Sequence, residues 1–357
     1  MIPANSKLRD RDTLVTKEGI IFRVLGYSHP PKAWVCEPLY APDAIFKSTN
    51  PKAFRAKGKW IHYKFYEDEG LRFVQQKYPH YTIFYEPLQE RLVGVQHALI
   101  AKTRKPDERL RKLMGKPPKD DLLKALHKVF NSIATRSSLS DKDFGVFGSL
   151  LHGFYHPRFS DLDLIVYGGE KLESLCETLE DLYRERASPL RNEFGSEEAT
   201  KGKRWRFVNY SPKEYLWHQR RKTIYALFED KDSGRVVKTE FEPVKDWREI
   251  RNEYSPDIRI VKKGWIKAVA RVTDDHDASF IPSIYQIEPI KILDGPKVEH
   301  HRIVSYVEEF RVQAKRDEEV YVEGNLEEVI TPTDVFHQVT LTYGPRYYEQ
   351  VLKVLQT

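Results

Sequence analysis

An alternating segment, Asp161-Leu-Asp-Leu-Ile-Val, restricts the fold of this chain more than any other feature. Along a β-strand, residues i and i+2 point to the same face, so Leu162 and Leu164 enter a core while Asp161 and Asp163 lie side by side on the opposite face. Two neighbouring carboxylates repel each other and are costly without a cation. Oxygen ligands favour Mg²⁺ or Mn²⁺ over zinc. The segment therefore predicts a buried strand with a Mg²⁺ or Mn²⁺ site on its polar face.

A Gly-Ser pair precedes this segment by a fixed, short distance. Gly148 and Ser149 follow the apolar run 144–147, and eleven residues separate Ser149 from Asp161. A glycine after a buried strand lets a phosphate approach the backbone, and the serine offers a hydroxyl and an N–H to phosphate oxygens. An Asp-x-Asp alone is a weak signal, but its combination with Gly-Ser predicts a phosphate cradle and metal carboxylates in one strand-turn-strand unit.

The 357 residues, 40% of them hydrophobic, suffice for two or three domains with their own cores. Short apolar segments between turn residues predict a β-rich N-terminal module over 1–105. The charged, proline-containing stretch 102–119 is typical of an exposed connector. Residues 106–250 alternate strand and helix patterns, and 251–357 return to short strands. We expect an α/β (α+β) chain with a central mixed-sheet domain and β-rich flanking modules.

Positive charge is concentrated in one stretch, although the whole chain carries only +6. Residues 201–222 contain eight basic side chains and a single acid, Glu214, with five aromatic residues among them. Cations interleaved with aromatics suit phosphate contact plus base stacking, and a solvated basic face is the competing interpretation. The candidates for nucleic-acid contact are Lys201, Lys203, Arg204, Trp205 and Arg206.

A second, weaker patch lies in residues 47–64, which contain six basic side chains and no acid. The same patch includes three aromatic residues. Its basic members are Lys47, Lys52, Arg55, Lys57, Lys59 and Lys64, and its aromatic members are Phe54, Trp60 and Tyr63.

Arg220 and Lys222 are candidates for nucleotide binding because they precede the strand expected at 236–241. There, cations could neutralise the β- and γ-phosphates of a nucleotide and the leaving pyrophosphate. Ordinary helix-surface charge is the alternative interpretation.

The Gly-Ser and Asp-x-Asp pair resembles the signature of the DNA polymerase β nucleotidyltransferase superfamily. The wider chain is similar to a group of archaeal predicted nucleotidyltransferases with no assigned substrate. The similar segments are residues 16–30, 220–222, 270–275 and 280–282. The resemblance implies a metal-dependent transfer of a nucleotide, with Asp161 and Asp163 as catalytic metal ligands and Gly148 and Ser149 as triphosphate contacts.

In that superfamily a third acid on a neighbouring strand completes a two-metal site, in which one ion activates the attacking oxygen and the other steadies the triphosphate. The segment 236–243 offers Glu240 and Glu242, which share a strand face with Lys238. We expect Glu240 to be the third catalytic and metal-binding acid, with Glu242 as the alternative.

These patterns predict a Mg²⁺-dependent enzyme that moves a nucleoside monophosphate from an NTP to an acceptor hydroxyl, with RNA as the favoured acceptor. Two alternatives stay open, a non-catalytic RNA-binding protein on the same fold and a nucleotidyltransferase for a protein or small molecule. No window approaches the ~20 apolar residues of a bilayer span, and the N-terminus lacks the apolar core of a signal peptide. We expect a cytoplasmic protein without a membrane partner.

Overall fold

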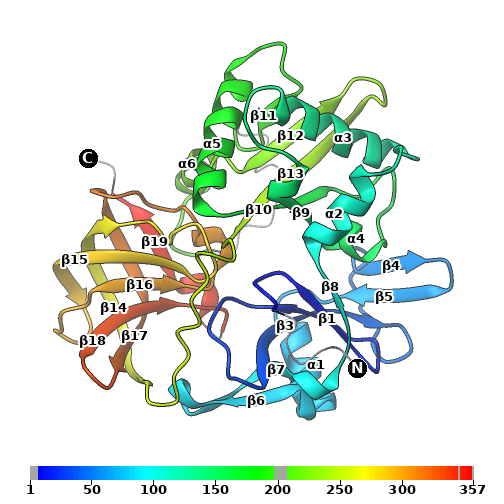
Figure 1. Cartoon of the computed structure of the whole chain (residues 1–357). Helices are drawn as coiled ribbons and strands as arrows, with labels where there is room; N and C mark the ends of the chain where they lie inside the picture. Colours follow the sequence, from blue (N-terminus) through cyan, green and yellow to red (C-terminus); the bar gives the residue numbers. More distant parts are fainter. Residues whose placement is uncertain (1–6, 197–198, 200–206, 345, 356–357) are drawn as a thin grey trace. The chain divides into compact units, whose positions relative to one another are not determined.

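The computed structural model describes residues 7–196, 199, 207–344 and 346–355. The chain forms two compact units (Figure 1). The first consists of Met1–Ile83, Val93–Gly195 and Thr223–Arg251, and the second of Phe84–Leu92, Ser196–Lys222 and Asn252–Thr357. The N-terminal module thus shares a unit with the central domain, and the described residues 207–222 belong to the unit of the C-terminal strands. No helix in the described ranges is long and apolar enough to cross a membrane.

The N-terminal module is an antiparallel sheet with strand order β4-β5-β3-β2-β1-β8, extended by β7 beside β3 and by β6 beside β7. Its core contains Leu14, Phe22 and Val24, all without exposed surface. The module confirms the expected β-rich N-terminus, with helix α1 as an addition. Its elements are β1 (Thr13–Thr16), β2 (Ile21–Val24), β3 (Ala33–Pro42), β4 (Phe54–Lys57), β5 (Trp60–Lys64), α1 (Glu69–Lys77), β6 (Thr82–Tyr85), β7 (Glu90–Gln96) and β8 (Ile100–Arg104).

The central domain is a mixed sheet with strand order β11-β12-β13-β10-β9, in which β10 and β13 are parallel. Leucines of α3 and α5 pack with Leu162 and Leu164 in one core, so these helices cover one face of the sheet. The domain confirms the expected central α/β architecture. Its elements are α2 (Pro106–Met114), α3 (Asp121–Ala134), β9 (Phe144–Val146), α4 (Gly148–His152), β10 (Leu162–Tyr167), α5 (Gly169–Arg184), β11 (Leu190–Asn192), β12 (Tyr225–Asp230) and β13 (Arg235–Val244).

The connector expected at 102–119 is largely structured, so this prediction was wrong. Helix α2 occupies its centre, begins at Pro106 and carries acids in its first turn. Proline is tolerated at the first helical position because no intrahelical N–H bond is lost there. Leu110 of α2 is fully buried in the central core. The three apolar residues Leu110, Leu113 and Met114 were too weak a sequence signal against the surrounding charge.

The second unit contains the C-terminal strands, which close on themselves because β14 pairs with both β15 and β17. The ring runs β14-β15-β16-β18-β17, and β19 adds to β17. This closed sheet confirms the expected β-rich C-terminal module. The unit's elements are α6 (Pro212–Arg221), β14 (Arg259–Asp274), β15 (Ser283–Asp294), β16 (Arg302–Ser305), β17 (Glu319–Ile330), β18 (Val335–Leu341) and β19 (Val351–Val354).

A buried ion pair connects the N-terminal module to the central sheet within the first unit. Arg11, which is only 1% exposed, contacts the carboxylate of Glu242 on β13. Two residues away, the guanidinium of Arg9 lies 3.4 Å from the ring centroid of Tyr167 on β10. Charges removed from water are costly unless they are paired. Arg11 of the N-terminal segment therefore neutralises the buried carboxylate of Glu242 in the central sheet.

We expect Arg11→Met to lower the thermal midpoint of the first unit by about 6–15 °C, since an unpaired buried charge costs about 3–5 kcal/mol. Arg72→Met is the matched control, because Arg72 is 61% exposed and pairs only with Asp68, a type of contact worth about 0–1 kcal/mol. The double variant Arg11→Met/Glu242→Leu should regain most of the loss. A fall for Arg11→Met no larger than the control's, measured by calorimetry, would contradict a stabilising role for the pair.

Candidate active site

Strand β10 positions two carboxylates on the face of the central sheet opposite the α3 and α5 helices. Leu162 and Leu164 are fully buried in the central core, while Asp161 is exposed and Asp163 is half-buried. The loop that leads into Asp161 is held by Arg235, which donates to the carbonyl oxygens of Pro157, at 2.8 Å, and Ser160. The alternation predicted from the sequence thus places Asp161 and Asp163 on one polar face.

Gly148 lies against the side chain of Asp163. Its φ is +53°, and a Cβ atom placed on Gly148 would be 1.9 Å from Oδ2 of Asp163. The backbone amide of Phe147, the residue before, donates to the carbonyl oxygen of Asp163 at 2.8 Å. Ser149 follows in the first turn of α4 and is half-buried. The structure therefore brings the Gly-Ser pair and the second aspartate together, and only glycine fits at position 148.

Glu240 lies beside Asp163 in the parallel β10–β13 pairing, where the two residues are register partners. Neighbouring strands are about 4.8 Å apart, so both carboxylates belong to one polar surface. The ammonium group of Lys238 contacts Glu240 at 2.5 Å and Glu193 at 3.5 Å. Lys238 therefore neutralises part of the charge that the acids bring together.

Glu242, the alternative third acid, has a different environment. It is buried and pairs with Arg11, and its register partner on β10 is Ile165. The structure therefore gives Glu242 a place in the ion pair between the N-terminal module and the sheet, and it leaves Glu240 beside the two aspartates.

Burial and the neighbouring acids raise the pKa values of both aspartates. Burial, followed by the charge of Glu240, raises the pKa of Asp163 from 3.8 to about 6, and the ammonium group of Lys64 opposes this shift. Partial desolvation also raises the pKa of Asp161, and Lys238 opposes this shift. The folded protein thus disfavours ionisation of both aspartates, a cost that a bound divalent cation would relieve.

The donor set suits a hard divalent cation, because every candidate ligand is a carboxylate oxygen. Within the described ranges, however, no three His, Cys, Asp or Glu side chains are arranged as a metal site. The ammonium group of Lys238 contacts Glu240 at 2.5 Å, so it competes with a metal for this carboxylate. Asp161 and Asp163 are suitable ligands for such a cation. Glu240 would become a third ligand if the ion displaced Lys238 from it.

Arg220 and Lys222 belong to the second unit, whereas Asp161 and Asp163 belong to the first. Lys222 is 1% exposed, and its ammonium group donates to the carbonyl oxygen of Glu309. Burial lowers the pKa of Lys222 well below its ordinary value. This environment is that of a structural residue, not of a solvent-facing phosphate contact. Arg220 is exposed at the end of α6.

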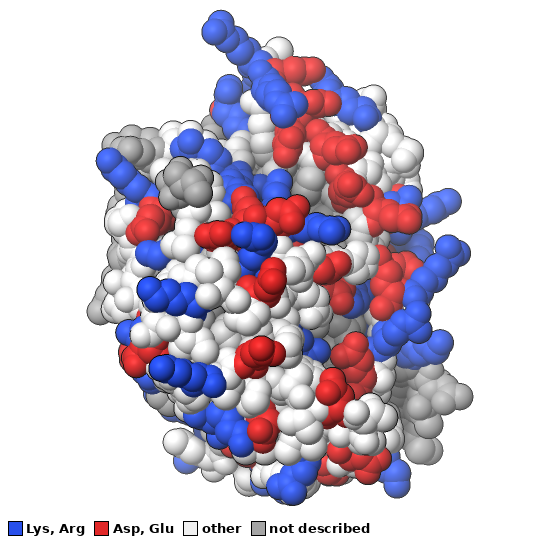
Figure 2. Space-filling view, turned by 90° about the vertical axis from the view of Figure 1, so that its left-hand side faces the viewer, with Lys and Arg blue, Asp and Glu red and all other residues white. Residues whose placement is uncertain are grey.

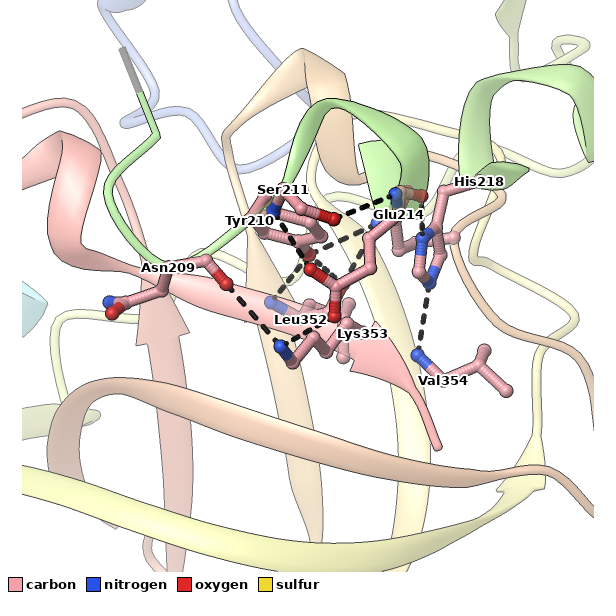
Figure 3. A network of polar contacts seen from close by, with 9 residues as sticks. Asn209, Tyr210, Ser211, Glu214, His218, Leu352, Lys353 and Val354 are labelled. Atoms are coloured by element: carbon pink, nitrogen blue, oxygen red, sulfur yellow. Dashed lines mark hydrogen bonds and ion pairs between the residues drawn. The ribbon is translucent and has the colours of Figure 1, made fainter. Parts of the chain in front are cut away.

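The segment before Arg220 is fixed to the C-terminal strands (Figure 3). Ser211 and Glu214 form a capping box at the start of α6, and Glu214 receives a contact from Lys353 at 2.9 Å. Tyr210 donates to the carbonyl oxygen of Leu352, and the backbone amide of Val354 donates to Nε2 of His218 at 3.0 Å. These contacts explain why α6 joins the second unit. The candidates Lys201, Lys203, Arg204, Trp205 and Arg206 lie outside the described residues.

Two cations near the acids were not among the predicted site residues. Lys238 shares a strand face with Glu240 in the sequence, so the period-two pattern could have identified it. Lys64 comes from β5 of the N-terminal module, about a hundred residues before Asp163. No local pattern links these two positions, because their proximity depends on the packing of two sheets.

Comparison with known proteins agrees with this geometry. Residues 126–229 match the family model described as a nucleotidyltransferase domain. An uncharacterized protein of Methanocaldococcus jannaschii is 26% identical over 332 residues, which cover 91% of this chain and 92% of the relative. No solved structure is significantly similar to the chain. The matched range contains Gly148, Ser149, Asp161 and Asp163, and it confirms the resemblance that the motif predicted.

The raised pKa of Asp163 has a measurable consequence for stability. The folded state disfavours the ionised carboxylate, so stability falls as pH rises from 3.8 through about 6. In EDTA, Asp163→Asn should therefore be more stable than the wild type by about 1–3 kcal/mol at pH 8, with the difference vanishing near pH 4. Thermal midpoints over this pH range provide the measurement.

Asp181→Asn is the matched control for this measurement, because Asp181 is 71% exposed and pairs only with Arg184. It should show no gain at pH 8. A lower midpoint for Asp163→Asn than for the wild type at pH 8 would show that the carboxylate stabilises the fold. It would contradict the inference that the folded state disfavours the ionised form of Asp163.

Proposed function

We propose that this chain, which carries a nucleotidyltransferase domain at its centre, transfers a nucleoside monophosphate from an NTP to an acceptor hydroxyl. The acceptor oxygen attacks the α-phosphorus, the bond to the β-phosphate oxygen breaks, and pyrophosphate leaves with the electron pair of that bond. The observation that supports this proposal best is the contact between Gly148 and Asp163, because it places the Gly-Ser turn directly against a carboxylate that is a candidate metal ligand.

Mg²⁺ or Mn²⁺ is the proposed cofactor. Asp161 and Asp163 would hold it, with Glu240 as the third ligand once Lys238 moves away. A divalent ion at this position supplies charge neutralisation for the α-phosphate and a lowered pKa for the attacking hydroxyl. The carboxylates of this chain would determine where the positive charge of the ion lies. In the absence of the ion, Lys238 stabilises Glu240.

Gly148 and Ser149 are the proposed triphosphate contacts. The missing Cβ of Gly148 lets the carboxylate of Asp163 lie against the backbone, and Ser149 is half-buried at the start of α4. Positioning and charge neutralisation, without a covalent nucleophile, are the main requirements of phosphoryl transfer. These two residues would align the α-phosphate with the aspartates.

Lys64 is the proposed counter-charge for the triphosphate in place of Lys222, which is buried in the second unit. Although burial works against it, Tyr40 and Asp163 raise the pKa of Lys64, so its ammonium group stays charged beside the acids. Arg220 is exposed on α6 of the second unit, and its role in nucleotide binding stays a prediction from the sequence.

RNA is the proposed acceptor. The basic and aromatic composition of residues 201–206 supports it. A non-catalytic RNA-binding role is the second candidate, and it is favoured by the contact of Lys238 with Glu240, which competes with a metal. Incubation with α-phosphate-labelled NTP, Mg²⁺ and total RNA separates the cases. Label on RNA supports the proposal, label on protein or a small molecule changes the acceptor, and no label with intact RNA binding favours the non-catalytic role.

We expect Asp161→Asn and Asp163→Asn each to abolish nucleotide transfer, and Glu240→Gln to lower it at least about a hundredfold, because charge at a metal site is worth several kcal/mol in the transition state. Initial rates with labelled NTP provide the measurement, with Asp181→Asn as the control. Mn²⁺ should also raise the thermal midpoint of the wild type and not that of Asp163→Asn. Wild-type rates for Glu240→Gln would remove this residue from the site.

A further inference from the structure

The β4–β5 hairpin of the N-terminal module carries the acid-free patch of residues 47–64. Two large aromatic side chains on it face solvent, Trp60 with 71% and Phe54 with 51% of their surfaces exposed. Single exposed aromatic residues are common on protein surfaces, so these two gain significance only from the positive charge beside them. The hairpin therefore combines positive charge with uncovered aromatic surface.

One face of the hairpin holds several of these groups. Lys57 is the register partner of Trp60, and Arg55 is the register partner of His62. Opposed residues share a face and residues two apart repeat it, so Lys64 lies on this face as well. The five side chains form what we call the hairpin face: Arg55, Lys57, Trp60, His62 and Lys64.

Ring contacts fix the hairpin face against the segment that follows α4. The ring of His62 lies 4.9 Å from that of Phe154. Tyr40, the register partner of Lys64 on β3, lies 5.3 Å from the ring of His152. Because α4 begins at Gly148, these contacts hold the hairpin face beside the candidate active site.

Further cations surround the end of α4 next to Lys57. The ammonium group of Lys57 lies 2.7 Å from the position that a Cβ of Gly153 would occupy. Arg104 donates to Nδ1 of His152 at 2.7 Å, and Arg109 donates to the carbonyl oxygen of Leu150 at 3.1 Å.

These cations lack acidic partners. Lys57, Arg104 and Arg109 form no ion pair with any acid in the described part of the chain. Partial burial, followed by the charges of Arg109 and Arg104, lowers the pKa of Lys57, and Lys119 and Lys102 add to the effect. Positive charges that repel one another without compensation form an anion-binding surface.

Other surfaces of the protein differ from this one. Figure 2 shows a face on which basic side chains are interspersed with acidic ones. Some exposed cations of the central domain have acidic partners, as Arg136 has Glu185 at 2.5 Å and Arg184 has Asp181 at 3.0 Å. Such mixed surfaces give no net attraction for a polyanion, whereas the hairpin face and its neighbouring arginines do.

We propose that the hairpin face, together with Arg104 and Arg109, binds the acceptor as single-stranded RNA. The cations contact successive phosphates, and an unpaired base stacks on Trp60. Lys64 lies beside Asp163, so a strand on this face ends at the acids. The inference rests on the proposed function for its account of why RNA lies there, but the binding itself is measurable without any nucleotide transfer.

The test is a fluorescence-anisotropy titration of an unstructured, labelled 12-nucleotide RNA at several salt concentrations, without NTP or divalent metal. Lys57→Gln/Arg109→Gln should lower the log-log salt slope by about 1.4, and Lys57→Gln alone by about 0.7, since each single-strand phosphate contact contributes about 0.7. Trp60→Ala should weaken binding about 5- to 150-fold with little change in slope.

Lys124→Gln/Arg136→Gln is the matched control, because it removes the same charge from the exposed surface of α3 and the turn after it. It should leave affinity and slope near the wild-type values. Equal losses in the control and in Lys57→Gln/Arg109→Gln would overturn the proposal, since attraction would then follow net charge alone. RNA binding that responds only to changes in residues 201–206 would also overturn it, as would no measurable RNA binding.

Failure of this inference and failure of the proposed function give different results. Asp163→Asn should bind the RNA at least as tightly as the wild type, since it removes a negative charge beside Lys64. A wild type that binds RNA through the hairpin face and transfers no nucleotide would reject the function and support the inference. A wild type that labels its acceptor while the hairpin variants keep full RNA affinity would reject the inference and support the function.

Discussion

The parallel pairing of β10 with β13 is the constraint on which the site depends. It aligns Asp163 with Glu240 and carries Glu242 into the interior two residues further along. Each added carboxylate must be offset, and two cations from different places do so. Lys238, on the same strand, serves Glu240, and Arg11, from the N-terminal segment, serves Glu242. The two ion pairs differ in how readily they separate. The half-exposed Lys238 can move away from Glu240, whereas separating the buried Arg11 from Glu242 carries a large free-energy cost.

The N-terminal module is therefore part of the central domain's site. Ile165 and Tyr167 continue the acid-bearing face of β10 and pack in a small core with Leu39 of β3. The same side of the sheet receives Arg11 beneath the acids and Lys64 beside them. A central domain cut at residue 106 would lose Arg11 and Lys64 and expose this apolar surface. The first unit is thus the smallest part of the chain that can be expected to form the complete site.

The sequence was sufficient to predict those parts of the candidate site whose residues lie close together in the chain. The period-two pattern at 161–166 predicted the shared face of Asp161 and Asp163, and the glycine at 148 has the positive φ and close approach that the motif suggested. It was insufficient to predict the parts that depend on packing between residues far apart in the sequence. Glu240 and Glu242 look alike in the sequence, and only the distant Arg11 separates them. Lys222 follows two arginines in a basic stretch, yet the packing of α6 on the C-terminal strands buries it.

The excursion of residues 207–222 into the second unit divides the central sheet into two stretches of chain. Strands β9 and β10 are synthesised before the excursion, and β12 and β13 after it. On the ribosome, β10 therefore emerges with one edge lacking its partner strand, a state that invites incorrect pairing. Asp161 and Asp163 are present during this interval, but Glu240 is not. The order of synthesis thus delays a complete set of three acids until about two-thirds of the chain has been made, so a truncated nascent chain cannot assemble it.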